Sequence, residues 1–317
     1  MFFLFRFAKY QIVIEAQQFG LELPRYKGST LRGGFGHVFR RICCSQPKEI
    51  CSVCLLAQAC PYALIFEPGP SPGSEVLKNY SNIPRPFVIE PPLDDKMHYA
   101  PGERLSFNLI LIGQAVQYLP YFILAFKELG KVGIGRGRLP YKLVDIAAAI
   151  NNRETVSIYN TSTGTITPVD SEQTAAILDE STNKTDGVLK LDFLTMTRLK
   201  FENTLTTDIP FHVLIRNLLR RISTLYYFYQ DGPKLDIDYK MLIDKAEEIK
   251  IISSELRLVD WERYSQRQNT HVNMGGLVGS VVYEGNVEPF MPLIKLGEVI
   301  HVGKGCVFGL GKYEVAE

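Results

Sequence analysis

The sequence has no long apolar run and no secretory signal. Its longest apolar stretches, FNLILIG and YFILAF, are much shorter than the ~20 apolar residues that a bilayer span needs. The opening MFFLFRFAKYQIVIEA is interrupted by Arg6 and Lys9 and lacks the small-residue cleavage site that ends a secretory signal. We therefore expect a cytoplasmic protein without a membrane partner, and a buried first strand at the start of the chain.

The sequence also has almost no net charge. Its 35 Lys and Arg residues are matched by 34 Asp and Glu residues, which gives a formal charge of +1. This balance excludes a histone-like tail or a polycation, so an anionic partner must be bound by local clusters of Lys and Arg. With 46% hydrophobic residues the chain of 317 residues can fill sizeable cores, and its length is about right for two domains.

Two parts of the chain show the same order of elements. The first is predicted to contain a strand in FRFAKYQIVIEA, a helix in KGSTLRGGFGHVFRRIC capped by Ser29 or Thr30, strands in PRPFVIEPP and RLSFNLILIG, a helix in YLPYFILAFKELG that ends at Gly130, and a strand after a glycine-rich loop. The second is predicted to contain a strand in LKLDFLTMTRLKF, a helix in DIPFHVLIRNLLRRISTLYYFY, strands around WERYSQRQ and GGLVGSVVYEG, a short helix in PFMPLIKLG and a final strand in VFGLGKYEV. The pattern predicts a duplicated β-α-β-β-α-β unit, with domains at 1–150 and 188–317 and a linker or surface hairpin at 151–187.

Each of these parts closes through a glycine-rich loop that carries cations. Closely spaced glycines let a backbone approach another chain and turn amides toward phosphate oxygens. The C-terminal loop precedes a strand and lacks the Lys-Ser or Lys-Thr of a mononucleotide phosphate loop, so that class of site is excluded. Its Lys304, Lys312 and His301 supply positive charge that suits an RNA backbone. A tight connection that needs positive φ explains the glycines equally well.

The predicted RNA-binding residues lie in both loops, on the helix of the second part, and in WERYSQRQ, where arginines interleave with aromatic residues as in modules that stack bases. They are Lys131, Arg136, Arg138, Arg220, Arg263, Arg267, Gly303, Lys304, Gly305, Gly309, Gly311 and Lys312. For Arg216, Arg220 and Arg221 on the helix, a solvated face is the simpler interpretation. Trp261 fits a core position as well as an RNA contact.

The first helix carries a histidine outside its apolar stripe. His37 lies on the side of Arg40 and Arg41, so we predict that it is not a core histidine. The glycines of LRGGFGH permit close approach of a partner, and an imidazole there can move a proton while the arginines hold a phosphate. Tyr26 and Lys27, just before the helix, are candidates to complete such a site. A lone helix histidine is nevertheless more often a solvated or structural residue.

Five of the six cysteines crowd one short segment with the spacing CC-x6-C-x2-C-x5-C. This pattern favours a structural zinc or an iron-sulfur cluster over buried thiols, and the predicted ligands are Cys44, Cys51, Cys54 and Cys60. An all-thiolate site leaves no position for an activated water, so such a metal would hold the loop in place and take no part in the chemistry. A redox-sensing or metal-sensing switch is a third interpretation.

Several segments of the second part resemble a known family. TMTRLKFENTLTTDIPFHVLIRNLLRRISTLYYFY, WERYSQRQ, GGLVGSVVYEG, PFMPLIKLGE and HVGKGCVFGLGKYEV together resemble the C-terminal domain of the CRISPR-associated Cas six family of repeat-processing endoribonucleases, within the RAMP superfamily. The terminal glycine-rich loop is the most specific of them. STLRGGFGHVFRR and CPYALIFEP resemble the opening of the same subgroup, so there the resemblance covers the chain in patches.

The resemblance implies an α+β protein with two tandem ferredoxin-like (RRM-like) domains and antiparallel sheets. It also implies binding of CRISPR repeat RNA and cleavage by the ribose 2′-hydroxyl, which leaves a 2′,3′-cyclic phosphate and a 5′-hydroxyl and needs no cofactor. That chemistry requires a general base, a general acid and cations, for which His37, Tyr26 and Arg41 are the candidates. Family members often pair a first-helix histidine with a tyrosine and a lysine. No lysine lies one or two turns beyond His37, so Arg40, Arg41 or Lys48 must take its place.

Two functions fit these residues. The first is a repeat-RNA endoribonuclease, and the alternative is a non-catalytic RNA-binding subunit of a CRISPR ribonucleoprotein, because an arginine-rich surface suits binding and cleavage equally. Effector-complex proteins and a second copy of the chain are the candidate protein partners.

Overall fold

The computed structural model describes residues 4–69, 83–151, 154–176, 178, 186–230, 235–265 and 269–316. It divides the chain into two compact units. The N-terminal unit comprises Arg6–Gln173 and Phe228–Asp231, and the C-terminal unit comprises Met1–Phe5, Thr174–Tyr227 and Gly232–Glu317. Each unit has its own main sheet.

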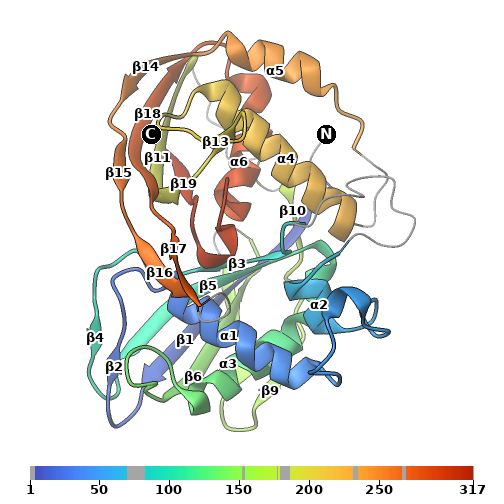
Figure 1. Ribbon diagram of the computed structural model, residues 1–317, viewed down its shortest axis with the longest axis vertical. Coiled ribbons are helices and arrows are strands. Elements are labelled where there is room, and N and C mark those ends of the chain that lie inside the picture. Colours follow the sequence, from blue (N-terminus) through green and yellow to red (C-terminus); the bar gives the residue numbers. More distant parts are fainter. Residues whose placement is uncertain are drawn as a thin grey trace. The chain divides into compact units, whose positions relative to one another are not determined.

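The N-terminal unit has the predicted order of elements (Figure 1). Its main elements are β1 (Arg6–Ala16), α1 (Gly28–Cys43), α2 (Pro61–Phe66), β3 (Phe87–Glu90), β5 (Arg104–Ile112), α3 (Leu119–Val132), β6 (Tyr141–Ala149) and β7 (Thr155–Ser157). Shorter pieces are β2 (Leu21–Glu22), η1 (Cys51–Val53), β4 (His98–Tyr99), η2 (Gly113–Tyr118), β8 (Tyr159–Asn160), β9 (Thr165–Ile166) and β10 (Gln173–Thr174). The strands lie in the order β3-β5-β1-β6-β7, and each neighbouring pair is antiparallel.

The core of the N-terminal unit is rich in aromatic rings. Alternate residues along most of β1 are buried, as expected for a strand with one fully covered face. On α1, the ring centroid of Phe35 lies 4.4 Å from that of Phe126 and 5.2 Å from that of Phe122, both of α3. Burial of each such ring contributes roughly 1.5–3 kcal/mol. This packing fixes one face of α1 against α3 and leaves the opposite face to solvent.

The C-terminal unit repeats the plan (Figure 1). Its main elements are β11 (Val188–Thr197), α4 (Phe211–Tyr229), α5 (Tyr239–Glu247), β14 (Lys250–Ser254), β15 (Arg257–Val259), β18 (Gly276–Glu284), α6 (Met291–Ile300) and β19 (Tyr313–Ala316). Shorter pieces are β12 (Lys200–Phe201), β13 (Thr204–Leu205), β16 (Glu262–Ser265), β17 (Thr270–Asn273), η4 (Glu288–Phe290) and η5 (Cys306–Phe308). The sheet order β14-β18-β11-β19 is antiparallel and equivalent to β3-β5-β1-β6 of the first unit.

The α+β class and the tandem antiparallel units are therefore confirmed, and the strand predicted around WERYSQRQ is present, although it lies outside the main sheet of its unit. That segment forms β16 in a separate hairpin with β17, and β14 and β15 lie beside β18 instead. Four of the five residues of β14 are exposed, so its sequence lacks the apolar alternation that marks a strand.

Two predicted helix ends also differ. Neither Ser29 nor Thr30 caps α1, because the helix already begins at Gly28 with Lys27 at its N-cap. The next helix does not end at Gly130. α3 continues to Val132 and ends at Gly133, whose φ of +84° lies in the region that favours glycine. Among the helices of the described ranges, none combines the length and the hydrophobicity of a bilayer span.

Candidate functional site

The solvent face of α1 carries the predicted proton carrier. His37 is exposed, which confirms that it is not a core histidine, and Arg41 one turn later is exposed as well. Gly33, one turn earlier, is open above its Cα, because a Cβ placed there would have no atom within 4 Å. An imidazole, a guanidinium and an uncovered stretch of helix therefore lie along one face.

The other two glycines of LRGGFGH have a different role from the one predicted. A Cβ at Gly34 would lie 2.9 Å from a methyl carbon of Leu129, and one at Gly36 would lie 2.9 Å from the ring of Phe66. Both glycines therefore allow close packing inside the unit and not the approach of a ligand.

The two arginines beside His37 also differ. Nη2 of Arg40 donates to the carbonyl of Pro47 at 3.1 Å, and its guanidinium lies 5.6 Å from the ring centroid of Tyr62. Arg40 thus binds α1 to the segment that follows it, whereas Arg41 remains exposed to solvent.

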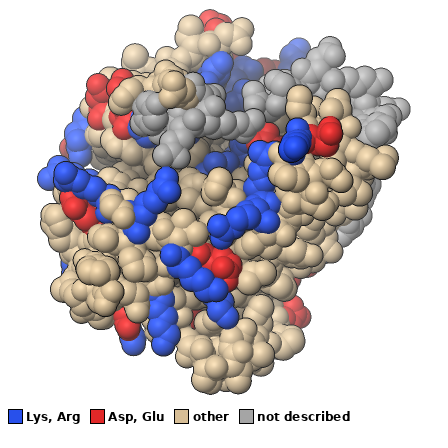
Figure 2. All heavy atoms as spheres, turned by 60° about the horizontal axis from the view of Figure 1, so that its bottom comes forward, with Lys and Arg blue, Asp and Glu red and all other residues tan. Residues whose placement is uncertain are grey.

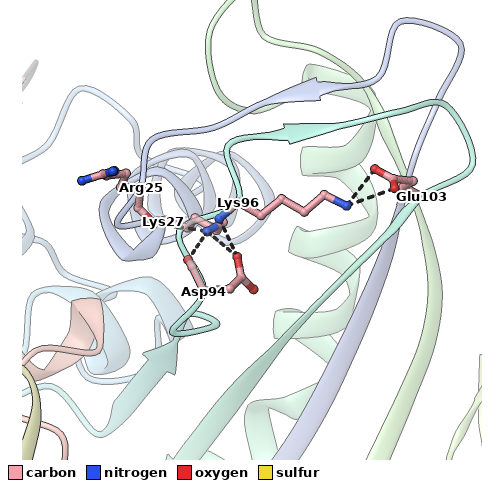
Figure 3. A network of polar contacts seen from close by, with 5 residues as sticks. All are labelled: Arg25, Lys27, Asp94, Lys96 and Glu103. Atoms are coloured by element: carbon pink, nitrogen blue, oxygen red, sulfur yellow. Dashed lines mark hydrogen bonds and ion pairs between the residues drawn. The ribbon is translucent and has the colours of Figure 1, made fainter.

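Just before α1, Tyr26 is half-buried and Lys27 is fully buried. The Lys27 ammonium donates to the carbonyls of Arg25 and Asp94 at 3.2 and 2.8 Å and to Oδ1 of Asp94 at 3.1 Å (Figure 3). These three contacts satisfy all its donors. The idea that Lys27 completes a site beside His37 is therefore wrong, because this lysine holds the start of α1 to the loop after β3.

The same loop is fixed by a second ion pair. Lys96 lies 3.0 Å from the carboxylate of Glu103, and its backbone N–H donates to Oδ1 of Asp94 (Figure 3). The backbone N–H of Ala100 and the hydrogen bond from Lys96 lower the pKa of Glu103. This polar network thus holds the residues just before α1 in place. Its two lysines, Lys27 and Lys96, do not cover the exposed face of α1.

The cysteine segment does not confirm the predicted metal site. All five thiols are free and half-buried, and the described residues contain no group of three or more His, Cys, Asp or Glu side chains placed to hold a metal ion. Burial, followed by the neighbouring Cys60 and Cys44, raises the pKa of Cys43 to about 12. Burial and Glu67, with smaller effects of Cys44 and Cys60, also raise the pKa of Cys51, so these three of the four predicted ligands lie near one another without forming a metal-holding group in the described structure.

In the C-terminal unit, the glycine-rich loop between α6 and β19 needs its glycines for conformation. Gly303, Gly305, Gly309 and Gly311 all have positive φ. A Cβ at Gly311 would lie 1.8 Å from the carbonyl oxygen of Val302, and one at Gly303 would lie 2.5 Å from that of Arg198. These contacts support the tight-connection interpretation and place the loop directly against the end of β11.

Two basic residues near this loop are internal. His301 is fully buried, and its Nδ1 lies 3.1 Å from the carbonyl oxygen of Leu310, so its predicted role as a surface charge is wrong. Arg221 is also buried, and Nε and Nη2 both donate to the carbonyl of Ile300, at 3.0 and 2.8 Å. Arg221 satisfies the C-terminal end of α6 and does not belong to a solvated face.

Several predicted RNA-binding cations are paired with carboxylates. Lys131 lies 2.6 Å from Glu128 and Arg136 lies 3.3 Å from Glu22. Lys312 lies 3.9 Å from Glu314, while Arg138 is exposed at a φ of +51°. Arg267 lies outside the described residues.

Lys304 and Arg220 belong to a group of four cations, which we call the cation cluster: Arg198, Lys200, Arg220 and Lys304. Burial, then the charges of Lys200 and Arg198, and finally that of Arg220 lower the pKa of Lys304. The prediction missed Arg198 and Lys200. The alternation of Arg198, Leu199 and Lys200 indicates only that the two cations lie on the same side of an extended segment, and it carries no signal that they lie near Lys304. Figure 2 shows one face of the molecule on which Lys and Arg are more numerous than Asp and Glu.

Arg263, which does not belong to the cation cluster, lies over an aromatic ring. The Arg263 guanidinium is 4.7 Å from the ring centroid of Phe308 in the glycine-rich loop, and burial lowers its pKa. Trp261, two residues earlier, is half-buried. Of the arginines in WERYSQRQ, Arg263 thus contacts the loop through a cation–π interaction.

Two family models match successive parts of the chain. Residues 4–171 match AF_1859_N, an N-terminal domain, and residues 191–313 match the CRISPR-associated endoribonuclease Cas6. The chain belongs to the AF_1859_N family and carries a Cas6 domain. The resemblance expected from the sequence is confirmed by these matches.

Similar proteins extend over nearly the whole chain. An uncharacterized protein of Archaeoglobus fulgidus is 25% identical over 300 residues, which are 92% of each protein. A Cas6 product complex has a TM-score of 0.59 at 15% identity, and Cas6 of Thermus thermophilus has a TM-score of 0.55 at 14% identity. Each of these two alignments covers 98% of this chain and 99% of the other. At such identities the likeness shows a shared fold.

A larger protein contains the same fold. In a partial Cas6-RT-Cas1–Cas2 complex, one chain is similar with a TM-score of 0.57 at 13% identity. The alignment covers 99% of this chain but 46% of the other. The fold described above thus also occurs as part of a longer polypeptide.

Proposed function

We propose that this protein is an endoribonuclease that processes CRISPR repeat RNA. The match of residues 191–313 to the Cas6 endoribonuclease is the observation that carries the proposal. The exposed imidazole of His37 and the cation cluster support it, because cleavage of RNA needs a proton carrier and a means of holding phosphates.

The proposed reaction uses the sugar of the RNA itself. The 2′-hydroxyl loses its proton and attacks the adjacent phosphorus, the bond to the 5′-oxygen breaks, and that oxygen takes up a proton. The products are a 2′,3′-cyclic phosphate and a 5′-hydroxyl. His37 acts as general base or general acid, Tyr26 assists in proton transfer, and Arg41 stabilises the charge that develops on the phosphate oxygens. No metal ion takes part in these steps.

RNA is held by cations of both units. The proposed contacts in the N-terminal unit are Lys131, Arg136 and Arg138. Those in the C-terminal unit are Arg220, Arg263, Arg267, Lys304 and Lys312, together with backbone amides at Gly303, Gly305, Gly309 and Gly311. The Arg263 guanidinium lies over the ring of Phe308, and Lys304 is exposed. By contrast, the carboxylate pairs of the N-terminal cations must open before these can bind phosphate.

The decisive experiment compares two RNAs of one repeat sequence, taken from the CRISPR arrays of the same genome. One carries a 2′-deoxynucleotide at the scissile position and the other is unmodified. We expect cleavage of the unmodified RNA at equal rates with and without EDTA, and binding without cleavage of the modified RNA. A loss of cleavage in EDTA that magnesium restores would contradict the metal-independent mechanism.

The alternative is a non-catalytic RNA-binding subunit. The burial of Lys27 favours it, because the lysine nearest to His37 along the helix entry is unavailable to substrate. A protein of this kind binds both RNAs equally and cuts neither. The same assay therefore separates the two functions.

The similar chain in the Cas6-RT-Cas1–Cas2 complex also supports a proposal about protein partners. We propose that this protein passes its product RNA to proteins of a CRISPR complex. Co-purification of the tagged protein with and without ribonuclease treatment separates contacts through RNA from direct protein contacts.

A further inference from the structure

The cation cluster concentrates positive charge within the C-terminal unit. The side chains of Lys304 and Lys200 lie close to each other, and Arg198 and Arg220 are near enough to act on Lys304 electrostatically. Two ammonium groups in direct contact repel each other unless an anion lies beside them. The arrangement is therefore unfavourable in the free protein.

Among the described residues, no carboxylate relieves this repulsion. Within the described part of the chain, none of the four cations forms an ion pair, whereas Arg216 on the same helix lies 2.9 Å from Glu247 and Lys295 lies 3.1 Å from Glu298. The charges that shift the pKa of Lys304 are those of Lys200, Arg198 and Arg220, which are all cations. The cluster thus lacks the counter-charge that other cations of the same unit have.

The backbone around the cluster is held by specific hydrogen bonds. The carbonyl of Arg198 accepts from the backbone N–H of Lys304 at 3.0 Å, and the carbonyl of Lys200 accepts from Nδ2 of Asn217 at 3.1 Å. Asn217 is 3% exposed, and its Oδ1 accepts from Nη2 of Arg220 at 3.0 Å. One buried amide therefore positions members of the cluster from both β12 and α4.

Two guanidinium groups beside the loop retain unused donors. Nε of Arg198 and Nε of Arg263 are buried and have no hydrogen-bond partner among the described residues. A buried N–H without an acceptor is costly, and an anion that enters the site can supply the acceptor. Arg198 also donates from Nη1 to the carbonyl of Asn273, which holds its guanidinium in place.

We propose that Arg198, Lys200, Arg220 and Lys304 form a binding site for two or more adjacent phosphates of the RNA backbone, with Asn217 as its positioning residue. The proposal rests on the proposed function for its ligand. RNA is favoured over an acidic polypeptide because the cluster lies within residues 191–313, which match the Cas6 endoribonuclease, and guanidinium groups bind phosphate oxygens in pairs. Binding at this site does not depend on the base sequence of the RNA.

The test measures binding of a fluorescent 2′-deoxy repeat RNA, and of an unrelated single-stranded RNA, over a series of KCl concentrations. The variants are Arg198→Gln, Lys200→Gln and the double variant. Arg216→Gln and Lys190→Gln are matched controls, since these cations lie in the same unit and pair with Glu247 and Asp192. Each single variant is expected to weaken binding of both RNAs about 3- to 10-fold and to reduce the slope of log K against log salt by about 0.7. The controls leave both quantities unchanged.

A second readout separates a binding role from a structural one. Without RNA, Lys200→Gln is expected to raise the melting temperature, because it removes one of two adjacent like charges. Saturating RNA is expected to raise the melting temperature of the wild type more than that of this variant. A lysine that only supports the fold would instead lower the melting temperature when it is replaced.

The outcomes are distinguishable. If the wild type binds neither RNA, the proposed function fails and the present proposal fails with it. If the wild type binds RNA but the variants bind with unchanged affinity and salt slope, only the present proposal is overturned. Displacement of RNA by polyglutamate at an equal concentration of charge would also overturn it, in favour of an acidic protein partner.

Discussion

The two glycine-rich loops occupy the same place in their units but differ in charge arrangement. The N-terminal loop joins α3 to β6 and the C-terminal loop joins α6 to β19, and several glycines of each have positive φ. In the first loop Lys131 and Arg136 are paired with carboxylates. In the second, Lys304 contacts other cations. Glycine content thus marks a tight connection in both loops, whereas the cations that surround Lys304 distinguish the loop that is suited to phosphate.

The largest expected effect is on the cleavage rate. It tests whether the N-terminal unit carries the catalytic residue while the C-terminal loop binds RNA. Replacement of His37 by Ala should lower the single-turnover cleavage rate by about 10²- to 10⁴-fold, because a general acid or base is lost. Binding of the 2′-deoxy repeat RNA should remain at the wild-type level. The matched control is His98→Ala, since His98 is another exposed histidine of the same unit. Wild-type cleavage by the His37 variant would remove His37 from the mechanism.

Replacement of a glycine by alanine in each loop compares their conformational requirements. Gly311→Ala combines a φ of +71° with a Cβ only 1.8 Å from the Val302 carbonyl oxygen, and we expect a loss of unfolding free energy of about 3 kcal/mol or more. Gly137→Ala has a φ of +80° but its nearest contact is at 3.7 Å, so only about 1 kcal/mol is expected. Urea unfolding followed by circular dichroism measures both. Equal losses would show that the clash at Gly311 relaxes.

The cations of the two loops should contribute unequally to RNA affinity. Lys304→Gln is expected to weaken binding of the 2′-deoxy RNA about 3- to 10-fold and Arg136→Gln only about 2-fold, because Arg136 must first leave Glu22. Fluorescence anisotropy at one fixed ionic strength measures both values. A larger loss for Arg136→Gln would reverse the assignment of the two loops.

The lowered pKa of Lys304 also predicts a pH dependence. As pH rises, this lysine should lose its proton before ordinary lysines do, so RNA affinity should begin to fall at a lower pH than in the Lys304→Arg variant, which keeps its charge. Rising pH has the opposite effect on the stability of the fold. The charged form is disfavoured in the fold, so the penalty is present below the folded-state pKa and is relieved as pH rises through it. Identical pH profiles for the two proteins would contradict both statements.

The smallest effect concerns the cysteine segment, which has no counterpart in the C-terminal unit. Because burial and neighbouring thiols raise the pKa of Cys43 to about 12, its thiolate fraction at pH 8 should be about 10³-fold below that of an ordinary thiol. Iodoacetamide labelling with peptide mass spectrometry should therefore find Cys43 unmodified in the folded protein and modified in urea. Rapid labelling of Cys43 in the folded protein would refute this environment.

Local patterns predicted much of the fold. The alternation in RFAKYQIVIEA and the apolar stripe of α1 identified the first strand and helix of the N-terminal unit, because a single covered face imposes its period on the sequence. β14 was missed because its side chains are mostly exposed and carry no such period. Likewise, the exposed position of His37 followed from helix geometry, while the burial of Lys27 did not, since its partner Asp94 comes from a distant loop.

The sequence by itself determined the duplicated order of strands and helices, the family resemblance and the cationic character of the two glycine-rich loops, because each of these depends on residues close together in the chain. Only the tertiary structure decided which cations are neutralised. Arg221 and His301 are enclosed in the C-terminal unit, whereas Arg198 and Lys200 join Lys304 from about 100 residues away, with no carboxylate beside them in the described structure. Electrostatic interactions depend on distance in space and not on distance along the chain, so the sequence pattern could not show this cluster.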